Sequence, residues 1–140
     1  MNCIAAGKTH TACIDGDGHV WAFGNGSRGE LGTNDNSRFS LPKQVVGFDV
    51  GIVSIACGSH FTVALDACGG VWSWGSNFFG QLGRIGNSEI IQKVQGLPEI
   101  IFVTCGDEVT FCIDKSTKFG VLVQIWPTSK VLEGKIILVP

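Results

Sequence analysis

The chain has 140 residues, of which 44% are hydrophobic and 16% are charged, and its formal net charge is −2. This balance excludes wholesale disorder, because enough apolar surface is present to bury a core. The basic residues are scattered, so composition gives no signal for direct binding to nucleic acid. No apolar stretch approaches the roughly 20 residues of a membrane-spanning helix, and no secretory signal is visible. We therefore expect an intracellular protein, cytoplasmic or nuclear, without membrane contact.

Glycine is the unusual component of the composition. The sequence contains 20 glycines but only four prolines, and glycine at about twice its usual frequency, set among apolar runs, indicates many tight turns. The runs between these turns are rich in β-branched residues and too short for helices. Short strands are expected, in chain order, at residues 43–46, 52–57, 62–65, 71–74, 92–94 and 119–123.

An internal repeat organises these elements. With a shift of 51 residues, positions 7–37 match positions 58–88 without a gap, and 12 of the 31 pairs are identical, five of them Gly and one Trp. A third copy begins at residues 103–106, which match 55–58 with a shift of 48, so that Thr110 and Asp114 fall on Thr62 and Asp66. The Trp and the Gly-x-Leu-Gly segment of the earlier copies are missing from the third.

Four short strands in each repeat of roughly 50 residues are typical of a propeller blade. The predicted fold class is therefore all-β, a partial β-propeller of tandem four-stranded antiparallel blades. We expect tandem repeats over residues 1–114, with copies at about 2–51 and 52–102 and the start of a third at 103–114. Residues 115–140 are expected to form a divergent tail that could hold further strands.

Two segments carry a resemblance to a known family. Residues 55–65, Ile-Ala-Cys-Gly-Ser-His-Phe-Thr-Val-Ala-Leu, and residues 71–83, Val-Trp-Ser-Trp-Gly-Ser-Asn-Phe-Phe-Gly-Gln-Leu-Gly, resemble the regulator of chromosome condensation repeat family. Residues 5–7, 20–24 and 29–32 match more loosely. The resemblance implies a seven-bladed β-propeller that serves as an interaction platform. Some members are nucleotide exchange factors for the small GTPase Ran and bind chromatin, and others adjoin ubiquitin-ligase, kinase or lipid-binding domains. Two and a half repeats cannot close such a ring, so self-association through open blade edges is an alternative to a fragment.

The cysteines and histidines have structural interpretations. Six cysteines could form disulfides, but no Cys-x-x-Cys pair is present, and we expect them to be small buried residues of strands. His10 and His60 lack a recognisable carboxylate or nucleophile partner, and the resemblance implies that such a histidine hydrogen-bonds nearby backbone at a strand entry. No catalytic residue, metal site or cofactor site is therefore predicted.

Two glycine and aromatic patterns also have structural interpretations. Residues 24–29 match Gly-x-Gly-x-x-Gly, but no helix is expected to follow, so a turn is favoured over a phosphate site. Trp21 and Phe23, like Trp72 and Trp74, alternate along a strand, and without a basic groove we expect them to pack between blades rather than to stack on bases.

One loop carries the candidate for partner contact. Phe78 and Phe79 replace Ser27 and Arg28 of the first copy in a predicted loop, where exposed aromatic residues would suit a protein-contact hot spot. Packing on the neighbouring repeat is the alternative. The site residues proposed from sequence are therefore Phe78, Phe79 and Arg28.

The leading functional hypothesis is a non-enzymatic protein-interaction module, because the loops vary on a repeated scaffold. One alternative is a fragment of a guanine-nucleotide exchange factor for a Ran-type small GTPase, which would need a face built from several blades. Another is a truncated gene product without independent function. The expected partner is a protein, and a small GTPase is among the candidates.

Overall fold

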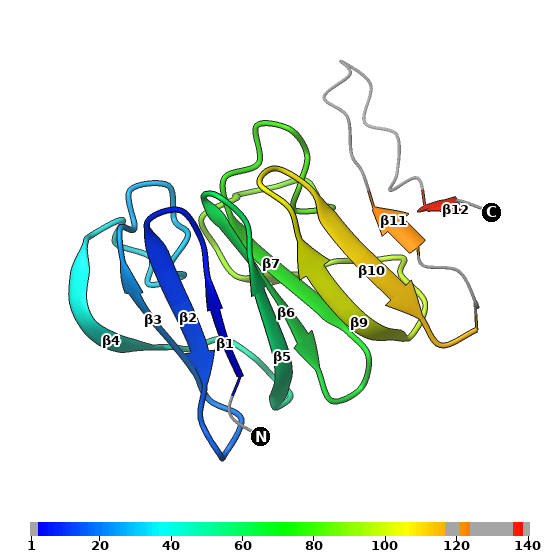
Figure 1. The fold of residues 1–140 in the computed structure, drawn as a ribbon, viewed down its shortest axis with the longest axis horizontal. Helices are drawn as coiled ribbons and strands as arrows, with labels where there is room; N and C mark the ends of the chain where they lie inside the picture. The colour runs from blue at the N-terminus through cyan, green and yellow to red at the C-terminus, as the bar shows by residue number, and fades with distance from the viewer. Residues whose placement is uncertain (1–2, 117–120, 124–135, 139–140) are drawn as a thin grey trace.

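The computed structural model describes residues 3–116, 121–123 and 136–138, and within these residues it contains strands and turns but no helix. Twelve strands form three four-stranded sheets that stand side by side (Figure 1). The first sheet, or blade, holds β1 (Cys3–Ala6), β2 (His10–Ile14), β3 (Val20–Gly24) and β4 (Phe39–Val45). The second blade holds β5 (Ile52–Cys57), β6 (Phe61–Asp66), β7 (Val71–Gly75) and β8 (Gln92–Lys93). The third holds β9 (Ile100–Cys105), β10 (Thr110–Asp114), β11 (Val121–Val123) and β12 (Ile136–Leu138).

The register of the strands shows that the first two blades are structural copies. Strands pair antiparallel in chain order within each blade. In the first blade Thr11 pairs with Phe23, and in the second Thr62 pairs with Trp74, so the 51-residue shift of the sequence is also the shift of the pairing. The predicted fold class, a partial propeller of four-stranded antiparallel blades, is confirmed.

The first apolar core lies between the first and second blades. Alternate residues of a strand point to opposite faces, so Ala12, Ile14 and Val20 turn one face of the first blade toward the second. They meet a larger set on the second blade: Ile52, Ile55, Ala64, Trp72 and Trp74. Phe48, in the connection to β5, lies edge-on against Trp72 with ring centroids 5.4 Å apart. Burial of these side chains is what holds the two blades together.

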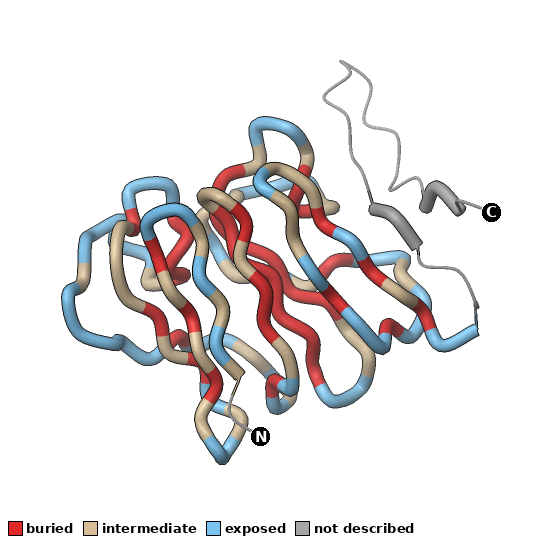
Figure 2. The backbone as a smooth tube through the Cα atoms, viewed as in Figure 1, coloured by how far each residue is buried: buried red, intermediate tan, exposed pale blue. Residues whose placement is uncertain are grey.

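The second core lies between the second and third blades and makes the middle blade the most buried part of the molecule (Figure 2). Phe61, Val63 and Leu65 of β6 pack toward Val103 and Cys112 of the third blade. Every residue of β6 and β7 is buried. Both strands therefore carry near-continuous rather than alternating apolar side chains, as expected for strands covered on both faces.

The expected fourth strands are present, although with different bounds. β4 begins four residues before the predicted 43–46 segment, and β8 holds two of the three residues predicted at 92–94. β11 lies within the predicted 119–123 strand. Most of the 115–140 tail lies outside the described residues, and the division into copies at residues 51, 102 and 114 stays a prediction. No helix in the described part of the chain could span a membrane.

Candidate functional site

Antiparallel order brings alternate loops to the same end of the molecule. Five loops at one end of the molecule form a surface that we call the rim. They form the upper edge in Figure 1 and lie at residues 7–9, 25–38, 58–60, 76–91 and 106–109. The hairpin turns that join β2 to β3 and β6 to β7 lie at the opposite end. The rim holds the long loops, and the candidate contact residues Arg28, Phe78 and Phe79 lie there.

The hairpin turns opposite the rim are built by an aspartate and a tryptophan. The Trp21 indole donates a hydrogen bond to Asp15 Oδ2 at 2.9 Å, and the Trp72 indole donates to Asp66 Oδ2 at 3.0 Å. Each aspartate also accepts two backbone N–H groups of its own turn. Trp21 and Trp72 therefore have the same polar role, which confirms the tandem equivalence predicted from the repeat.

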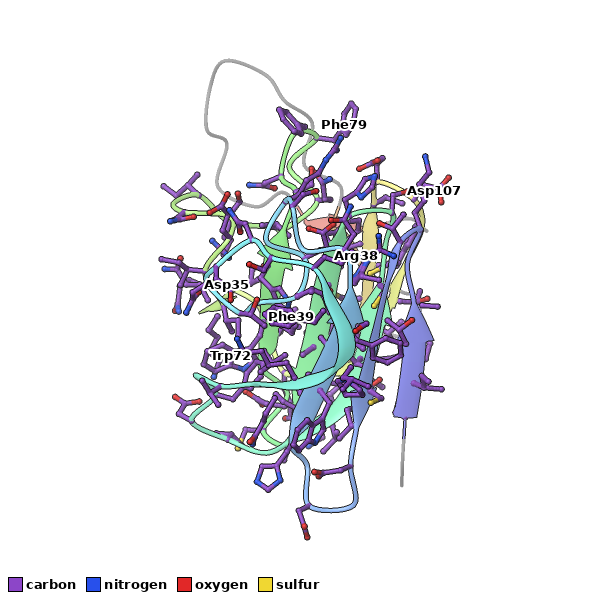
Figure 3. All side chains as sticks on the ribbon, turned by 90° about the vertical axis from the view of Figure 1, so that its left-hand side faces the viewer. Asp35, Arg38, Phe39, Trp72, Phe79 and Asp107 are labelled. Atoms are coloured by element: carbon purple, nitrogen blue, oxygen red, sulfur yellow. The ribbon has the colours of Figure 1, made fainter. Side chains whose placement is uncertain are left out.

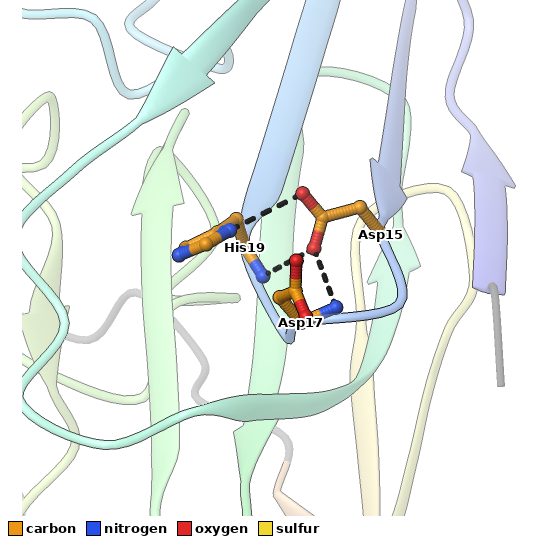
Figure 4. A group of neighbouring side chains, drawn as sticks. All are labelled: Asp15, Asp17 and His19. Carbon is orange, nitrogen blue, oxygen red and sulfur yellow. Dashed lines mark hydrogen bonds and ion pairs between the residues drawn. The ribbon is translucent and has the colours of Figure 1, made fainter.

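Asp15, Asp17 and His19 form a cluster of groups that could in principle hold a metal ion (Figure 4). However, Asp15 Oδ1 already accepts the N–H groups of Asp17 and His19, and Oδ2 accepts the Trp21 indole. The Trp21 indole and the His19 N–H lower the pKa of Asp15 to about 2. The second copy builds the same turn without acidic or histidine neighbours, so we assign this cluster to turn structure.

Glycines at matching positions share backbone conformation. Gly24 and Gly75 end β3 and β7 with φ of 110° and 111°, values that side chains rarely tolerate. A Cβ atom at Gly75 would lie 2.6 Å from the carbonyl oxygen of His60, and one at Gly24 would lie 2.5 Å from that of Thr9. Glycine thus allows the strand that enters the rim to cross tightly over the preceding rim loop.

The Gly-x-Leu-Gly segment of one blade docks on the next blade through backbone carbonyls. The Thr62 hydroxyl donates to the Glu30 carbonyl oxygen at 2.8 Å, and the Trp74 indole donates to the same oxygen at 3.0 Å. At the next junction the Thr110 hydroxyl donates to the Gln81 carbonyl oxygen at 2.7 Å. The threonine that the sequence aligns in all three copies therefore hydrogen-bonds to the preceding blade at both junctions, as Thr62 and as Thr110.

The side chains of Glu30 and Gln81 are buried at these junctions and face the next blade. Glu30 Oε1 lies 3.7 Å from His60 Nδ1, and Gln81 Nε2 donates to Glu108 Oε2 at 2.8 Å. The expectation that His60 has no carboxylate partner is therefore wrong, because Glu30 reaches it from the preceding blade. The backbone bond that the resemblance implied is not made by Nδ1, which has no hydrogen-bond partner.

His10 is buried in β2 beside the second blade. Its Nε2 lies 3.0 Å from Thr62 Oγ1. Burial and the nearby His60 lower the pKa of His10 to about 4, so the ring is neutral near pH 7. The neutral His10 ring contacts the Thr62 hydroxyl, which is itself hydrogen-bonded to the Glu30 carbonyl oxygen. His10 therefore has a packing role at the junction.

Phe78, Phe79 and Arg28 come together on the rim from two blades. The Phe78 and Phe79 side chains are 75% and 52% exposed, and Phe79 lies at the far end of the rim beyond the strands (Figure 3). The Arg28 guanidinium carbon lies 5.9 Å from the centre of the Phe78 ring, within range of a cation–π contact. The three residues proposed from sequence thus form one surface, which we call the aromatic tip.

The glycine and tryptophan patterns have the predicted structural roles where the structure describes them. Residues 24–29 end a strand and enter a turn, and no helix follows within the described segment. Trp72 and Trp74 pack in the first core as expected. Trp21 and Phe23 occupy the matching face of the first blade, where they are half-buried.

All six cysteines are free thiols. Cys57 lies in β5 with its Sγ directed to the Ala5 carbonyl oxygen, and burial raises the pKa of its thiol to about 12. Burial likewise raises the pKa of Cys112 to about 11. Cys68, in the turn after β6, is exposed. Five of the six lie in strands as expected, but of these Cys112 alone is fully buried and the other four are half-buried. The disulfide alternative is not supported by their free state.

Sequence reasoning did not find Glu30, Gln81 or Glu108. The usable signal was the middle position of Gly-x-Leu-Gly, which is Glu in one copy and its amide counterpart Gln in the other. A polar residue between glycine and leucine in both copies could have indicated a buried hydrogen-bonding role. The opposing residues, His60 and Glu108, share no chemistry, so their pairing required coordinates.

The sheets, turns and junctions define a stack of propeller blades built from one repeat. Models of the regulator of chromosome condensation (RCC1) repeat match residues 17–65 and 68–113, and a second model of the same repeat matches 2–30 and 52–81. The chain belongs to the RCC1 repeat family.

Among curated relatives, the E3 ubiquitin-protein ligase HERC2 of Mus musculus is 34% identical over 120 residues, covering 80% of this chain and 2% of that protein. The protein RCC2 homolog of Danio rerio is 32% identical over 122 residues, covering 81% of this chain and 24% of that protein. The chain therefore spans a quarter or less of the length of these relatives.

Among solved structures, human WBSCR16 superposes with a TM-score of 0.79 at 20% identity, covering 98% of this chain and 37% of that one. Prp20p of Saccharomyces cerevisiae superposes with a TM-score of 0.73 at 20% identity, covering 86% and 32%. At this identity the likeness concerns the fold.

Proposed function

We propose that the chain is a non-enzymatic protein-interaction module that binds a protein partner through the aromatic tip of Phe78, Phe79 and Arg28. The observation that carries this proposal is the exposure of two adjacent phenylalanines on the rim, with an arginine from the neighbouring blade against one of them. Exposed aromatic and arginine side chains gathered at one place are typical of interface hot spots. We place this activity inside the cell, in cytoplasm or nucleus.

The difference between the copies supports this assignment. The loops around Arg28 and Phe79 share glycine conformations at three matching positions, with φ of 110°, 76° and 67° in the first blade and 111°, 74° and 68° in the second. The tips nevertheless carry Ser-Arg in one and Phe-Phe in the other. A fixed backbone with different side chains at its tip is the arrangement by which repeat scaffolds vary their binding.

The relatives indicate a protein as the partner class. The structure of Prp20p is described with its binding to Gsp1p and histones, and HERC2 is named as a ubiquitin ligase. A small GTPase is therefore one candidate partner, and this chain supplies only part of the length of such proteins. The nucleotide-exchange alternative is tested by release of labelled guanine nucleotide from a Ran-type GTPase, which must accelerate if that alternative is correct.

The test of the proposal uses the aromatic tip and a matched exposed residue. A photo-reactive phenylalanine analogue at position 79 should cross-link one protein in cells, whereas the same analogue at Leu41, which is 76% exposed on β4, should not. With that protein purified, Phe78→Ser together with Phe79→Ser should weaken binding by roughly 30-fold or more, as for a hot spot. Leu41→Ser should leave binding unchanged.

The melting temperature distinguishes a role of the two phenylalanines in partner contact from a role in packing on the neighbouring repeat. The double serine variant should melt at the temperature of the unchanged chain, because both side chains are exposed. A lower melting temperature with unchanged binding would show that the phenylalanines pack on the neighbouring repeat instead. A cooperative melt of the chain by itself would count against a truncated product without function.

A further inference from the structure

We infer that Gln81 and Glu108 are positioning residues that hold the aromatic tip, and that the polar pair at each blade junction selects the chemistry of the residue opposite. The effect on partner binding rests on the proposed function, whereas the positioning of the loop does not. We call Phe79, Gln81 and Glu108 the second bridge, and Arg28, Glu30 and His60 the first bridge.

The second bridge connects the loop tip to the next blade through a buried amide. The Gln81 side chain is 2% exposed. Its Oε1 accepts the Phe79 backbone N–H at 2.9 Å, and its Nε2 donates to Glu108 Oε2 at 2.8 Å. The Gln81 backbone is fixed separately by the Thr110 hydroxyl. The position of Phe79 therefore depends on a residue of the third blade that lies outside the aromatic tip.

The first bridge has a related layout with the opposite chemistry, but its side-chain pair is not joined by a hydrogen bond. Glu30 Oε2 accepts the Arg28 backbone N–H at 2.7 Å, as Gln81 Oε1 accepts that of Phe79. When ionised, the second oxygen of Glu30 can only accept, so a donor suits the position opposite, and His60 Nδ1 lies there at 3.7 Å, beyond hydrogen-bond distance. Gln81 instead presents an amide N–H₂ group, so the residue opposite has to accept, and a carboxylate lies there.

This complementarity makes the two junctions non-interchangeable. A glutamate at position 81 would place its free oxygen against Glu108, and two carboxylates in a partly buried site repel each other. A glutamate paired with histidine is tolerated at the first junction. The glutamate–histidine pair of the first bridge, placed at positions 81 and 108, should therefore restore the second bridge.

Hydrogen exchange of two backbone amides provides the test, because it needs no partner protein. In Gln81→Glu the Phe79 amide should exchange roughly tenfold faster or more, since its acceptor is displaced. The Arg28 amide, at the matching position of the first bridge, should not change. Addition of Glu108→His should return the Phe79 amide to near its original rate, and Glu108→Gln by itself, which keeps an acceptor, should leave it unchanged.

A second variant covers a failure of Gln81→Glu to fold. Glu108→Ala leaves the buried amide in place but removes its acceptor, and it should also speed exchange at Phe79 and not at Arg28. An unchanged Phe79 amide in Glu108→Ala, or a double variant that is not rescued by histidine, would overturn the inference. Faster Phe79 exchange with unchanged partner binding would support the positioning role of the bridge and contradict the proposed binding through the aromatic tip.

Discussion

An aspartate near the end of the second strand of each blade holds the turn that follows. The Oδ1 atoms of Asp15, Asp66 and Asp114 each accept the backbone N–H two residues later, at 2.9 Å in all three. In the first two blades a tryptophan indole completes the site. The third blade keeps this aspartate and its backbone hydrogen bond, so the turn contact is common to all three blades.

The Asp15 carboxylate makes stability depend on acid pH. Hydrogen bonds from Trp21 and His19 lower the pKa of Asp15 to about 2, so the folded chain binds fewer protons than the unfolded chain between about pH 4 and pH 2. The contribution of Asp15 is therefore complete above about pH 4 and is lost as the pH falls toward 2.

Substitution tests this linkage. Asp15→Asn should reduce the dependence of the urea midpoint on pH between about 2 and 4. Asp17→Asn should keep that dependence, because the Asp17 side chain accepts none of the turn hydrogen bonds. Parallel pH profiles for the Asp15 variant and the unchanged chain would show that the turn is not held by the charged form.

At the level of strands, the crossing at Gly75 is a tight backbone constraint on the second blade. Gly75 combines a φ of 111° with a Cβ position 2.6 Å from the His60 carbonyl oxygen. Gly75→Ala should therefore lower the free energy of unfolding by about 2 kcal/mol or more, from backbone strain together with overpacking. Gly51→Ala, where an added Cβ meets nothing within 4 Å, should have a small effect in the same chemical denaturation experiment.

The strands were predictable because their signals are local. The apolar runs and the glycine turns lie within single copies, and the 51-residue shift relates one copy to the next. Thr110 and Asp114 make the same hydrogen bonds as Thr62 and Asp66, with which the sequence aligns them. The bridges were not predictable, because each pairs residues 27 to 30 positions apart on different blades. For this reason the lone histidine expected at position 60 proved to face Glu30.

The candidate site also has a part that the sequence predicts and a part that it does not. Position in a loop and chemical type were enough to propose Phe78 and Phe79, whose exposure follows from a turn at the strand end. That Arg28 lies against Phe78 depends on how adjacent blades stack, and blade stacking depends on buried side chains such as Leu31 and Leu82 rather than on the loop sequence.

At the scale of the whole molecule, the outer face of the first blade is less buried than the middle blade. The second blade is covered on both sides, whereas the first blade leaves Trp21 and Phe23 half-buried on its outer face. These residues match Trp72 and Trp74, which in the second blade are covered by a neighbour. We expect a further blade, of the same protein or of a second copy, to pack on this outer face, because each repeat of such a stack contacts its neighbours.

The free thiols allow each contact between blades to be followed in solution. Cys57 lies at the contact of β5 with Ala5 of the first blade, and Cys112, 1% exposed, lies in the core between the second and third blades. Their raised pKa values, about 12 and about 11, leave almost no thiolate near pH 8. Cys68 should therefore react first with a thiol reagent, and Cys57 and Cys112 only when their junctions open.

Mass spectrometry of the labelled chain would assign each step to a residue. With Cys68→Ser as the control, the fast step should disappear and the slow ones should remain. If Cys112 was labelled as fast as Cys68 in the native chain, the second and third blades would not be packed as described. Different labelling rates for Cys57 and Cys112 would instead show which of the two contacts between blades opens more readily.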